Sequence, residues 1–318
     1  MYTEFEKIEH NRVNGLLFMI NDLVYRRPHL HFDSEIVYVI SGEGSISTSQ
    51  TEFHISAGQM IFFNSCQLHE FRSNASSSSM RLLIMQLPMT DFASVYPALD
   101  SMLFESRPIN LPFDSKLLSY LISAAQSYFD ELDYQPLRTT GLAYLIVYEL
   151  LQLVNFNQLD FSQQNKMLDL QKRIQRISAK IHENFVNGIS LQELASQEGF
   201  STTYFSHFFK NNFGISFQEY LNNVRCERGR LLLLTTNENL LSITNLCGFS
   251  DVRTFNKAFC LLYGHRPKDL LDERKKNSNK QLIDQKLIIS SSSTDLQRIF
   301  NPTESLAVLK ELLNSLNL

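Results

Sequence analysis

The chain has 318 residues, which is enough for two or three domains, and its 43% hydrophobic and 19% charged residues exclude a disordered chain. The net charge of −4 hides an uneven distribution. Residues 1–165 carry 9 basic and 18 acidic side chains, whereas residues 166–276 carry 16 basic and 11 acidic ones. The second part is therefore basic enough to face an anionic partner.

Cysteine usage and hydropathy indicate a cytoplasmic protein. The four cysteines show no C-x-x-C spacing, which favours reduced thiols. The N-terminus lacks the basic start and apolar run of a signal peptide. The longest apolar stretch, 142–154, contains Glu149 and Gln152 and is too short to span a bilayer. We therefore expect no membrane partner.

Residues 16–87 are predicted to form many short strands. The β-branched run Ile36 to Ile40 ends at the turn sequence Ser41 to Gly44. Further short runs follow up to residues 80–87, where Pro88 ends the last one. Strands of this length at such close spacing predict an antiparallel sandwich or a small barrel.

Two amphipathic helices are predicted at about 112–154. Apolar residues recur every three or four positions in two runs that Pro136 separates, which is typical of an αα-hairpin. We expect the first helix, 115–132, to form the seam of a homodimer, because exposed apolar stripes usually mark an interface. Its stripe consists of Leu118, Leu121, Ile122, Ala125 and Phe129. The alternative is that the whole stripe packs within one chain. The polar segment 155–166 is the expected linker.

Residues 167–271 are predicted to be helical and contain an internal duplication. The sequence Gly-Phe-Ser at 199–201 returns 49 residues later at 248–250, and Gly214 returns 50 residues later as Gly264. A short helix, a turn that contains glycine and a second helix can place that second helix in the major groove of DNA. The duplication therefore predicts two helix–turn–helix units.

This segment resembles the DNA-binding domain of the AraC/XylS family of bacterial transcription regulators. The first unit of the family reads L-A-x-x-x-G-F-S-x-x-Y-F-x-x-x-F-K-x-x-x-G, and residues 194–214 fill every specified position. The middle element is present as Arg225, Gly229, Leu232 and Leu233. The second unit is present as Ile243, Gly248, Phe249, Ser250, Asp251, Phe255, Phe259, Gly264 and Pro267.

Four positions depart from the family pattern. Thr244 replaces a small alanine, Thr254 an aromatic residue, Cys260 a basic residue and Phe217 a proline. Three of them lie in the second unit. They leave open whether this unit reads bases or mainly contacts phosphates.

The resemblance implies which side chains meet DNA. The base-contact candidates are Thr203, Ser206 and His207 in the first unit and Val252, Arg253, Asn256 and Lys257 in the second. Lys210 and Arg225 are the phosphate candidates. A linking helix over about 217–235 is expected to place both units in successive major grooves, roughly 34 Å apart. On residue type alone, the same helix faces could instead be solvated surfaces.

A second resemblance concerns the N-terminal part, where H-x-H-x3-E-x6-G begins at His29 and Gly58 precedes His69. These two elements resemble the motif pair of the cupin barrel. The resemblance implies a site made by His29, His31, Glu35 and His69, which are our candidates for the effector pocket. In metal cupins the same four positions bind a metal. Here Asn64 and Cys66 replace the proline and glycine of the second element, so we expect an organic effector and no metal or other cofactor. The alternatives are a bound metal at the same four residues and a purely structural or dimerising barrel.

The predicted fold is α+β in two domains. Residues 1–160 form an antiparallel β cupin-like barrel with an αα-hairpin at about 112–154, and residues 161–272 form an all-α domain with two helix–turn–helix units. Residues 273–318 are an extension of unknown role. The expected function is a sequence-specific transcription regulator, not an enzyme, controlled by a small effector such as a sugar and acting with RNA polymerase. The alternatives are a cupin metalloenzyme, dioxygenase or isomerase, fused to a DNA-binding module, and a regulator controlled by a protein or lipid partner.

Overall fold

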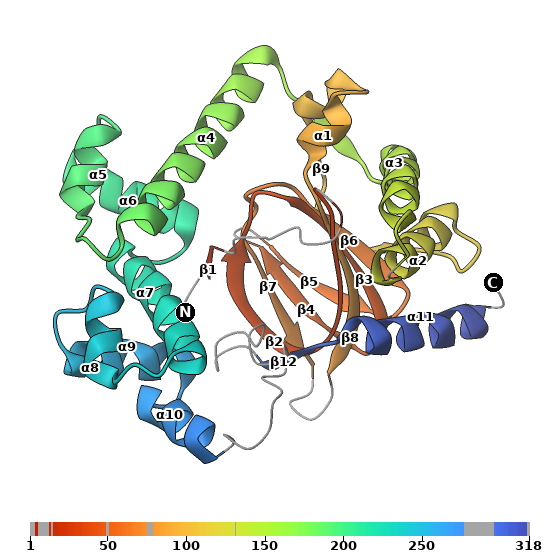
Figure 1. Cartoon of the computed structure of the whole chain (residues 1–318). Helices are drawn as coiled ribbons and strands as arrows, with labels where there is room; N and C mark the ends of the chain where they lie inside the picture. The colour runs from red at the N-terminus through yellow and green to blue at the C-terminus, as the bar shows by residue number, and fades with distance from the viewer. Residues whose placement is uncertain are drawn as a thin grey trace. The chain divides into compact units, whose positions relative to one another are not determined.

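The computed structural model describes residues 4–5, 13, 15–48, 51–74, 79–130, 132–276 and 296–316 (Figure 1). The chain divides into two compact units. The barrel unit comprises residues 5–168 and 296–318, and the helical unit comprises residues 1–4 and 169–295. This two-part α+β architecture confirms the predicted fold class.

The barrel unit is built on a curled antiparallel sheet in the order β10-β6-β3-β8-β2-β7-β4-β5, with β12 added to β2. The strands are β1 (Glu4–Phe5), β2 (Leu17–Leu30), β3 (Ser34–Ser41), β4 (Glu43–Thr48), β5 (Glu52–Ser56), β6 (Gln59–Phe63), β7 (His69–Ser73), β8 (Met80–Leu87), β10 (Ile109–Asn110) and β12 (Leu296–Ile299). A separate pair joins β9 (Met102–Phe104) to β11 (Phe156–Gln158).

The sequence of β3 contains a continuous apolar run because both faces of this strand are buried. Successive side chains of a strand point to opposite faces of the sheet. Ile36 and Tyr38 belong to the apolar cluster that also contains the helices, whereas Val37 and Val39 belong to a second cluster made of strand residues. Both faces of β3 are therefore buried, and no polar alternation is left in its sequence.

Helices pack against one side of this sheet. They are α1 (Met89–Ala93), the 3₁₀ helix η1 (Pro97–Ser101), α2 (Lys116–Phe129), α3 (Gln135–Leu153) and α11 (Pro302–Leu316). The predicted hairpin is present as α2 and α3. The dimer seam predicted on α2 is wrong, because its whole stripe is at most 5% exposed within one chain. It packs on α3, on the sheet and on α11.

Residues 296–316 of the predicted extension, 273–318, belong to the barrel unit, whereas residues 277–295 lie outside the described part of the chain. Strand β12 pairs antiparallel with β2, with Ile299 opposite Asn21. Helix α11 lies beside α2 in Figure 1 and adds Val308, Leu309 and Leu312 to the apolar cluster. The unit boundary also differs from the predicted one at 160/161, because it falls at 168/169 inside the continuous helix α4 (Phe161–Asn184).

The helical unit continues from α4 through six further helices. They are α5 (Leu191–Gln197), α6 (Thr202–Phe213), α7 (Phe217–Thr235), α8 (Leu240–Leu246), α9 (Val252–Tyr263) and α10 (Pro267–Lys276). Aromatic rings fill its interior, and five phenylalanines of α6 and α9 are fully buried. Among the described residues, no helix combines the length and apolar character that crossing a membrane requires.

Candidate DNA interface and buried histidine site

The first helix–turn–helix unit consists of α5, the turn at Gly199 and α6. Gly199 has a φ of +73°, in the left-handed region that glycine adopts without strain. The Ser201 hydroxyl accepts a hydrogen bond from the Tyr204 amide at the start of α6, and Gly214, with a φ of +74°, ends the helix. The local sequence therefore fixes both ends of the helix that would enter DNA.

Helix α6 has an aromatic inner face and a polar outer face. Phe205, Phe209 and Phe213 are fully buried. The four predicted DNA contacts of this unit are all exposed: Thr203, Ser206, His207 and Lys210. The structure thus gathers them on one solvent-facing surface, where a major groove could reach them.

Two further aromatic residues of α6 are not fully buried. Tyr204 is 55% exposed, with its ring 4.6 Å from that of Phe200, and Phe208 is half-buried. The Arg173 guanidinium lies 4.6 Å from the centre of the Phe200 ring. These aromatic rings therefore form a partly exposed surface that packs against α6 and makes a cation–π contact with Arg173.

The second unit consists of α8, the turn at Gly248 and α9. Asp251 starts α9, because its Oδ1 accepts a hydrogen bond of 2.8 Å from the Thr254 amide. The Thr254 hydroxyl donates to Asp251 Oδ2 at 2.9 Å. These bonds from Thr254, the backbone one first, lower the pKa of Asp251. The threonine in place of the family's aromatic residue thus reinforces the start of the helix.

The predicted base contacts of α9 differ in accessibility. Arg253 and Lys257 are exposed, and Val252 is half-buried. Asn256 is half-buried as well, and its Oδ1 is buried without a hydrogen-bond partner among the described residues. A bidentate contact with adenine needs both ends of the amide, so Asn256 would have to turn before it could make one.

Helix α7 (Phe217–Thr235) links the two helix–turn–helix units and matches the predicted linking helix over about 217–235. It begins with a capping box between Ser216 and Glu219. Phe217, which stands where the family has proline, is 8% exposed and packs edge-on against Phe209 at 5.7 Å. The aromatic substitution therefore adds to the core of the first unit.

Arg225 makes internal contacts along α7. Its Nε donates a hydrogen bond of 2.8 Å to the Phe185 carbonyl, and its guanidinium lies 5.7 Å from the centre of the Phe249 ring. Burial lowers the pKa of this guanidinium. Arg225 therefore connects α7 to the chain after α4 and to the second unit, and its contact with phosphate stays a prediction.

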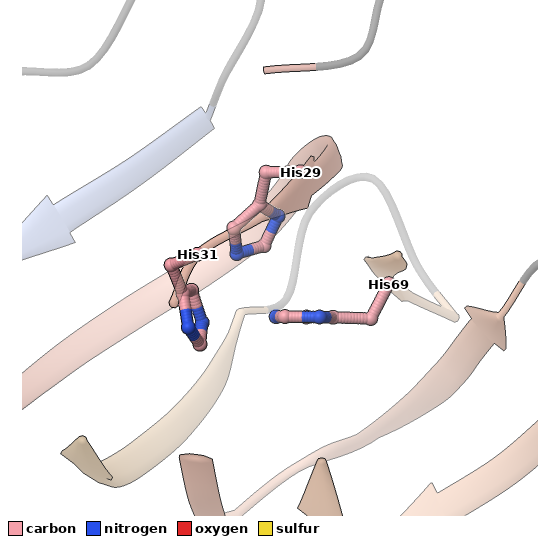
Figure 2. Close-up of side chains that lie close together, drawn as sticks. All are labelled: His29, His31 and His69. Atoms are coloured by element: carbon pink, nitrogen blue, oxygen red, sulfur yellow. The ribbon is translucent and has the colours of Figure 1, made fainter. Parts of the chain in front are cut away.

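The four residues predicted for the effector pocket come together at one end of β2. His29 lies directly opposite His69 of β7, His31 follows β2, and Glu35 is the second residue of β3. All four are at most 3% exposed. Figure 2 shows the three imidazoles turned toward one another. Their ring centroids lie 4.2 to 6.0 Å apart.

Backbone carbonyls fix the tautomer of each imidazole. The Nδ1 atoms of His29, His31 and His69 lie 2.7 to 3.0 Å from the carbonyls of residues 27, 33 and 67. A carbonyl only accepts, so each Nδ1 carries a proton, and in the neutral form of each ring Nε2 is the atom that carries a lone pair. This outer contact is the usual one for histidines that bind metals.

Glu35 places a carboxylate against this cluster. Its Oε2 lies 3.1 Å from His31 Nε2 and accepts a hydrogen bond of 2.8 Å from Gln86, and its Oε1 lies 3.4 Å from His69 Nε2. Burial alone would raise the pKa of Glu35, but hydrogen bonds from His31 and His69 and their charges, which both rings supply only when they are doubly protonated, outweigh it and hold that pKa well below its usual range. Burial lowers the pKa of His29, followed by the charges of His69 and Arg26.

These residues fit a single divalent transition metal ion. One ligand atom from each of the three histidines lies within 4.8 Å of the other two. Glu35 Oε1 and His69 Nε2 have no hydrogen-bond partner among the described residues, so two acceptors face each other without a proton donor. Neutral imidazoles and one ionised carboxylate are the donors that such ions prefer. An organic effector would have to separate rings that are in contact.

The loop before β7 shows how the altered cupin element is accommodated. Cys66, which replaces glycine, has a φ of +59°, in the left-handed region. Its amide donates to the His31 carbonyl at 2.8 Å. Asn64, which replaces proline, accepts from the Phe104 amide and donates to the Phe104 carbonyl. The loop therefore keeps the backbone path that places His69 opposite His29.

An apolar groove of about 480 Å³ in the barrel unit was not predicted from the sequence. Its lining comes from α3, from the segment between α1 and β9, and from Phe156 of β11. The only signal in the sequence is a pair of tyrosines one helical turn apart, Tyr144 and Tyr148, among the apolar residues of α3. They are 39% and 58% exposed.

Comparison with known proteins gives matches for both units. Residues 194–273 match the helix-turn-helix domain family, and residues 25–85 match the cupin domain family. The probable transcriptional regulator LumQ of Photobacterium leiognathi is 24% identical over 251 residues, 75% of this chain and 89% of LumQ. An uncharacterized HTH-type transcriptional regulator of Staphylococcus aureus is 21% identical over 239 residues, and this chain spans 31% of its length.

Among solved structures, an apo ToxT variant from Vibrio cholerae has a similar fold. The TM-score is 0.52 at 14% sequence identity, and the match covers 83% of this chain and 99% of that one. At this identity the similarity concerns the fold alone. It extends over a barrel and a helical part together, as in the two units described above.

Proposed function

Since this chain belongs to the AraC/XylS family of transcription regulators and carries a cupin-type sensor domain, we propose that it reads a specific duplex site with α6 and α9. The observation that carries this proposal is the pair of capped helices on one linking helix, each with an exposed face of polar or basic side chains. Base contacts from these faces would specify the site, and Lys210 would contact phosphate.

Selection from a pool of randomised duplexes with the full chain tests this proposal. We expect two short enriched blocks about one helical turn apart, one for each recognition helix. Affinity for the selected site should fall steeply with salt, because residues 166–276 carry a net charge of +5. A pool without enrichment, or an affinity that is the same at low and moderate salt, would contradict the proposal.

For the sensor domain, we infer that the cluster of His29, His31, Glu35 and His69 holds a divalent transition metal ion in place of the organic effector expected from the sequence. The contact between the imidazoles and the two facing acceptors without a proton support this assignment. Bound there, the ion would tie the ends of β2 and β7 to β3 and place a positive charge against the Glu35 carboxylate.

Titration of the metal-free full chain with Co²⁺ tests the metal site. We expect a visible absorption band that saturates at one ion per chain and is lost in His69→Ala. His54→Ala is the matched control, because the side chain of His54 is 58% exposed on the same barrel. The inference fails if Co²⁺ gives no band, or if both variants bind it as the unchanged chain does.

A regulator accounts for this site better than a metalloenzyme does. Catalytic metal sites keep one position open for water or substrate. Here the four donor residues are at most 3% exposed and are packed against Phe63 and Phe71, so a substrate has no direct access to them. We therefore infer a role in regulation for this site, and the expected effector, a sugar included, would bind elsewhere.

A homodimer, contact with RNA polymerase and a cytoplasmic location remain proposals. With the α2 stripe buried, the exposed face of α3 is the better candidate for a dimer seam. Leu137 is 80% and Leu145 42% exposed, and Gly141 lies between them with open space around its Cα. Sedimentation of Leu145→Asp would show a monomer where the unchanged chain is dimeric; equal sedimentation would move the seam elsewhere.

A further inference from the structure

The barrel unit contains a groove that neither the histidine site nor the DNA interface uses. Its floor is made of Phe92, Leu99 and Val147, which are 4% to 5% exposed. Its walls include Val95, Tyr96 and Tyr148, which are 48% to 69% exposed. Exposed apolar side chains are thus arranged around a buried apolar floor, and the open groove between them has a volume of about 480 Å³.

The size of the groove favours a small ligand over a protein partner. Ligand pockets usually have volumes of about 300–1,000 Å³. Eleven residues line the groove, whereas a stable protein interface takes roughly 20–30 residues on each side. A second copy of the chain that covered only this groove would therefore bury too little surface for a stable dimer.

The lining also indicates the chemistry of the ligand. None of the eleven residues is charged, and the polar groups available are three tyrosine hydroxyls and the amide of Gln152. Rings line both sides, and Phe92 meets Tyr144 edge-to-face with centroids 4.9 Å apart. Aromatic walls of this kind favour flat rings, which they contact by stacking or edge-on. We propose that the groove binds a neutral, flat aromatic molecule.

The groove is placed where such a ligand could act on the DNA-binding part. Phe156 of β11 lines its end and packs on Phe104 of β9, 5.7 Å away. Helix α4 begins at Phe161, three residues after β11 ends, and continues into the helical unit. A ligand that orders the β9–β11 pair would therefore change the start of the linking segment. This step rests on the proposed function as a regulator.

Nile red, which is neutral, flat and fluorescent in apolar surroundings, is a suitable probe for the full chain. We expect saturable binding at one site per chain. Val95→Asp puts a charge at an exposed position of the wall, and Tyr148→Ala removes a ring, so each should weaken binding by about tenfold. Phe113→Asp is the matched control, because Phe113 is an apolar side chain of the barrel unit that is 63% exposed and lies outside the lining, and this variant should bind as the unchanged chain does.

Three results would overturn the binding site: no saturation, equal affinity in all variants, or an affinity that falls as protein concentration rises, which would mean that a second copy covers the groove. The affinity for a selected duplex, measured with and without Nile red, tests the link to DNA separately. A change in that affinity supports the role of the groove ligand as an effector. An unchanged affinity contradicts that role but leaves the binding site itself supported. If the chain binds no duplex at all, the proposed function is contradicted, whereas the proposal that the groove binds a ligand is not.

Discussion

Replacing Leu309 by alanine tests whether the C-terminal helix belongs to the barrel core. Leu309 is fully buried in α11 and shares an apolar cluster with Leu118 and Leu121 of α2. Leu→Ala at buried sites costs about 2–5 kcal/mol, because the lost methyl groups leave a cavity that closes only in part. Since α11 is close to the chain end and can shift to fill some of the space, we expect about 3 kcal/mol.

Calorimetry of the full chain measures this loss as a shift of the barrel transition. For a unit of this size, 1 kcal/mol corresponds to roughly 2–4 °C, so Leu309→Ala should lower the transition by about 6–12 °C. Lys310→Ala is the matched control, because Lys310 is the next residue of α11 and is exposed. Its effect should stay within about 0.5 kcal/mol.

The comparison between the two variants is decisive. If Leu309→Ala melts at the same temperature as Lys310→Ala, then α11 is not part of the barrel core. We expect one melting transition for the barrel unit and one for the helical unit. Adding a selected DNA duplex identifies them, because a ligand raises the melting temperature of the unit that binds it. The transition that DNA leaves unchanged is the one that Leu309→Ala should lower.

Two further comparisons use paired substitutions. A Cβ at Gly229 would lie 2.8 Å from the Phe255 ring, whereas a Cβ at Gly141 would have no atom within 4 Å. In urea unfolding, Gly229→Ala should therefore destabilise the chain by about 1–3 kcal/mol, and Gly141→Ala should stabilise it by up to about 1 kcal/mol. Equal effects of the two substitutions would contradict the packing around α7. Arg253→Ala should cost about 1–3 kcal/mol at one base pair of the selected site, while Lys210→Ala should weaken all sequences about equally; identical sequence preferences would exclude base reading by Arg253.

The helix–turn–helix units could be predicted in detail from the sequence because their signals are local. Gly199 and Gly248 both adopt positive φ, at 73° and 79°, in turns that their spacing predicted. Asp251 caps a helix three residues before the amide that it binds. Side chains one turn apart, such as Phe205 and Phe209, share the buried face. Each of these relations spans only a few residues.

Apolar periodicity alone could not say what covers an apolar face. The α2 stripe was correctly predicted as a stripe and wrongly predicted as an interface, because its cover is partly α11, which begins 173 residues after α2 ends. Similarly, the motif with His29 and His69 predicted which residues meet, but the contact between the rings follows from the register that places these two residues opposite each other. Contacts between segments this far apart in the chain are not encoded in any short-range sequence pattern.

The sequence by itself determined the two-part α+β architecture, the glycine turns of both helix–turn–helix units, and the candidate residues for the DNA interface and the histidine site. Only the tertiary structure decided that the C-terminal segment completes the barrel unit, that Arg225 binds a backbone carbonyl, and that the groove beside α3 exists. The physical reason is that helix caps and periodic faces depend on neighbouring residues, whereas burial depends on which distant segments pack together.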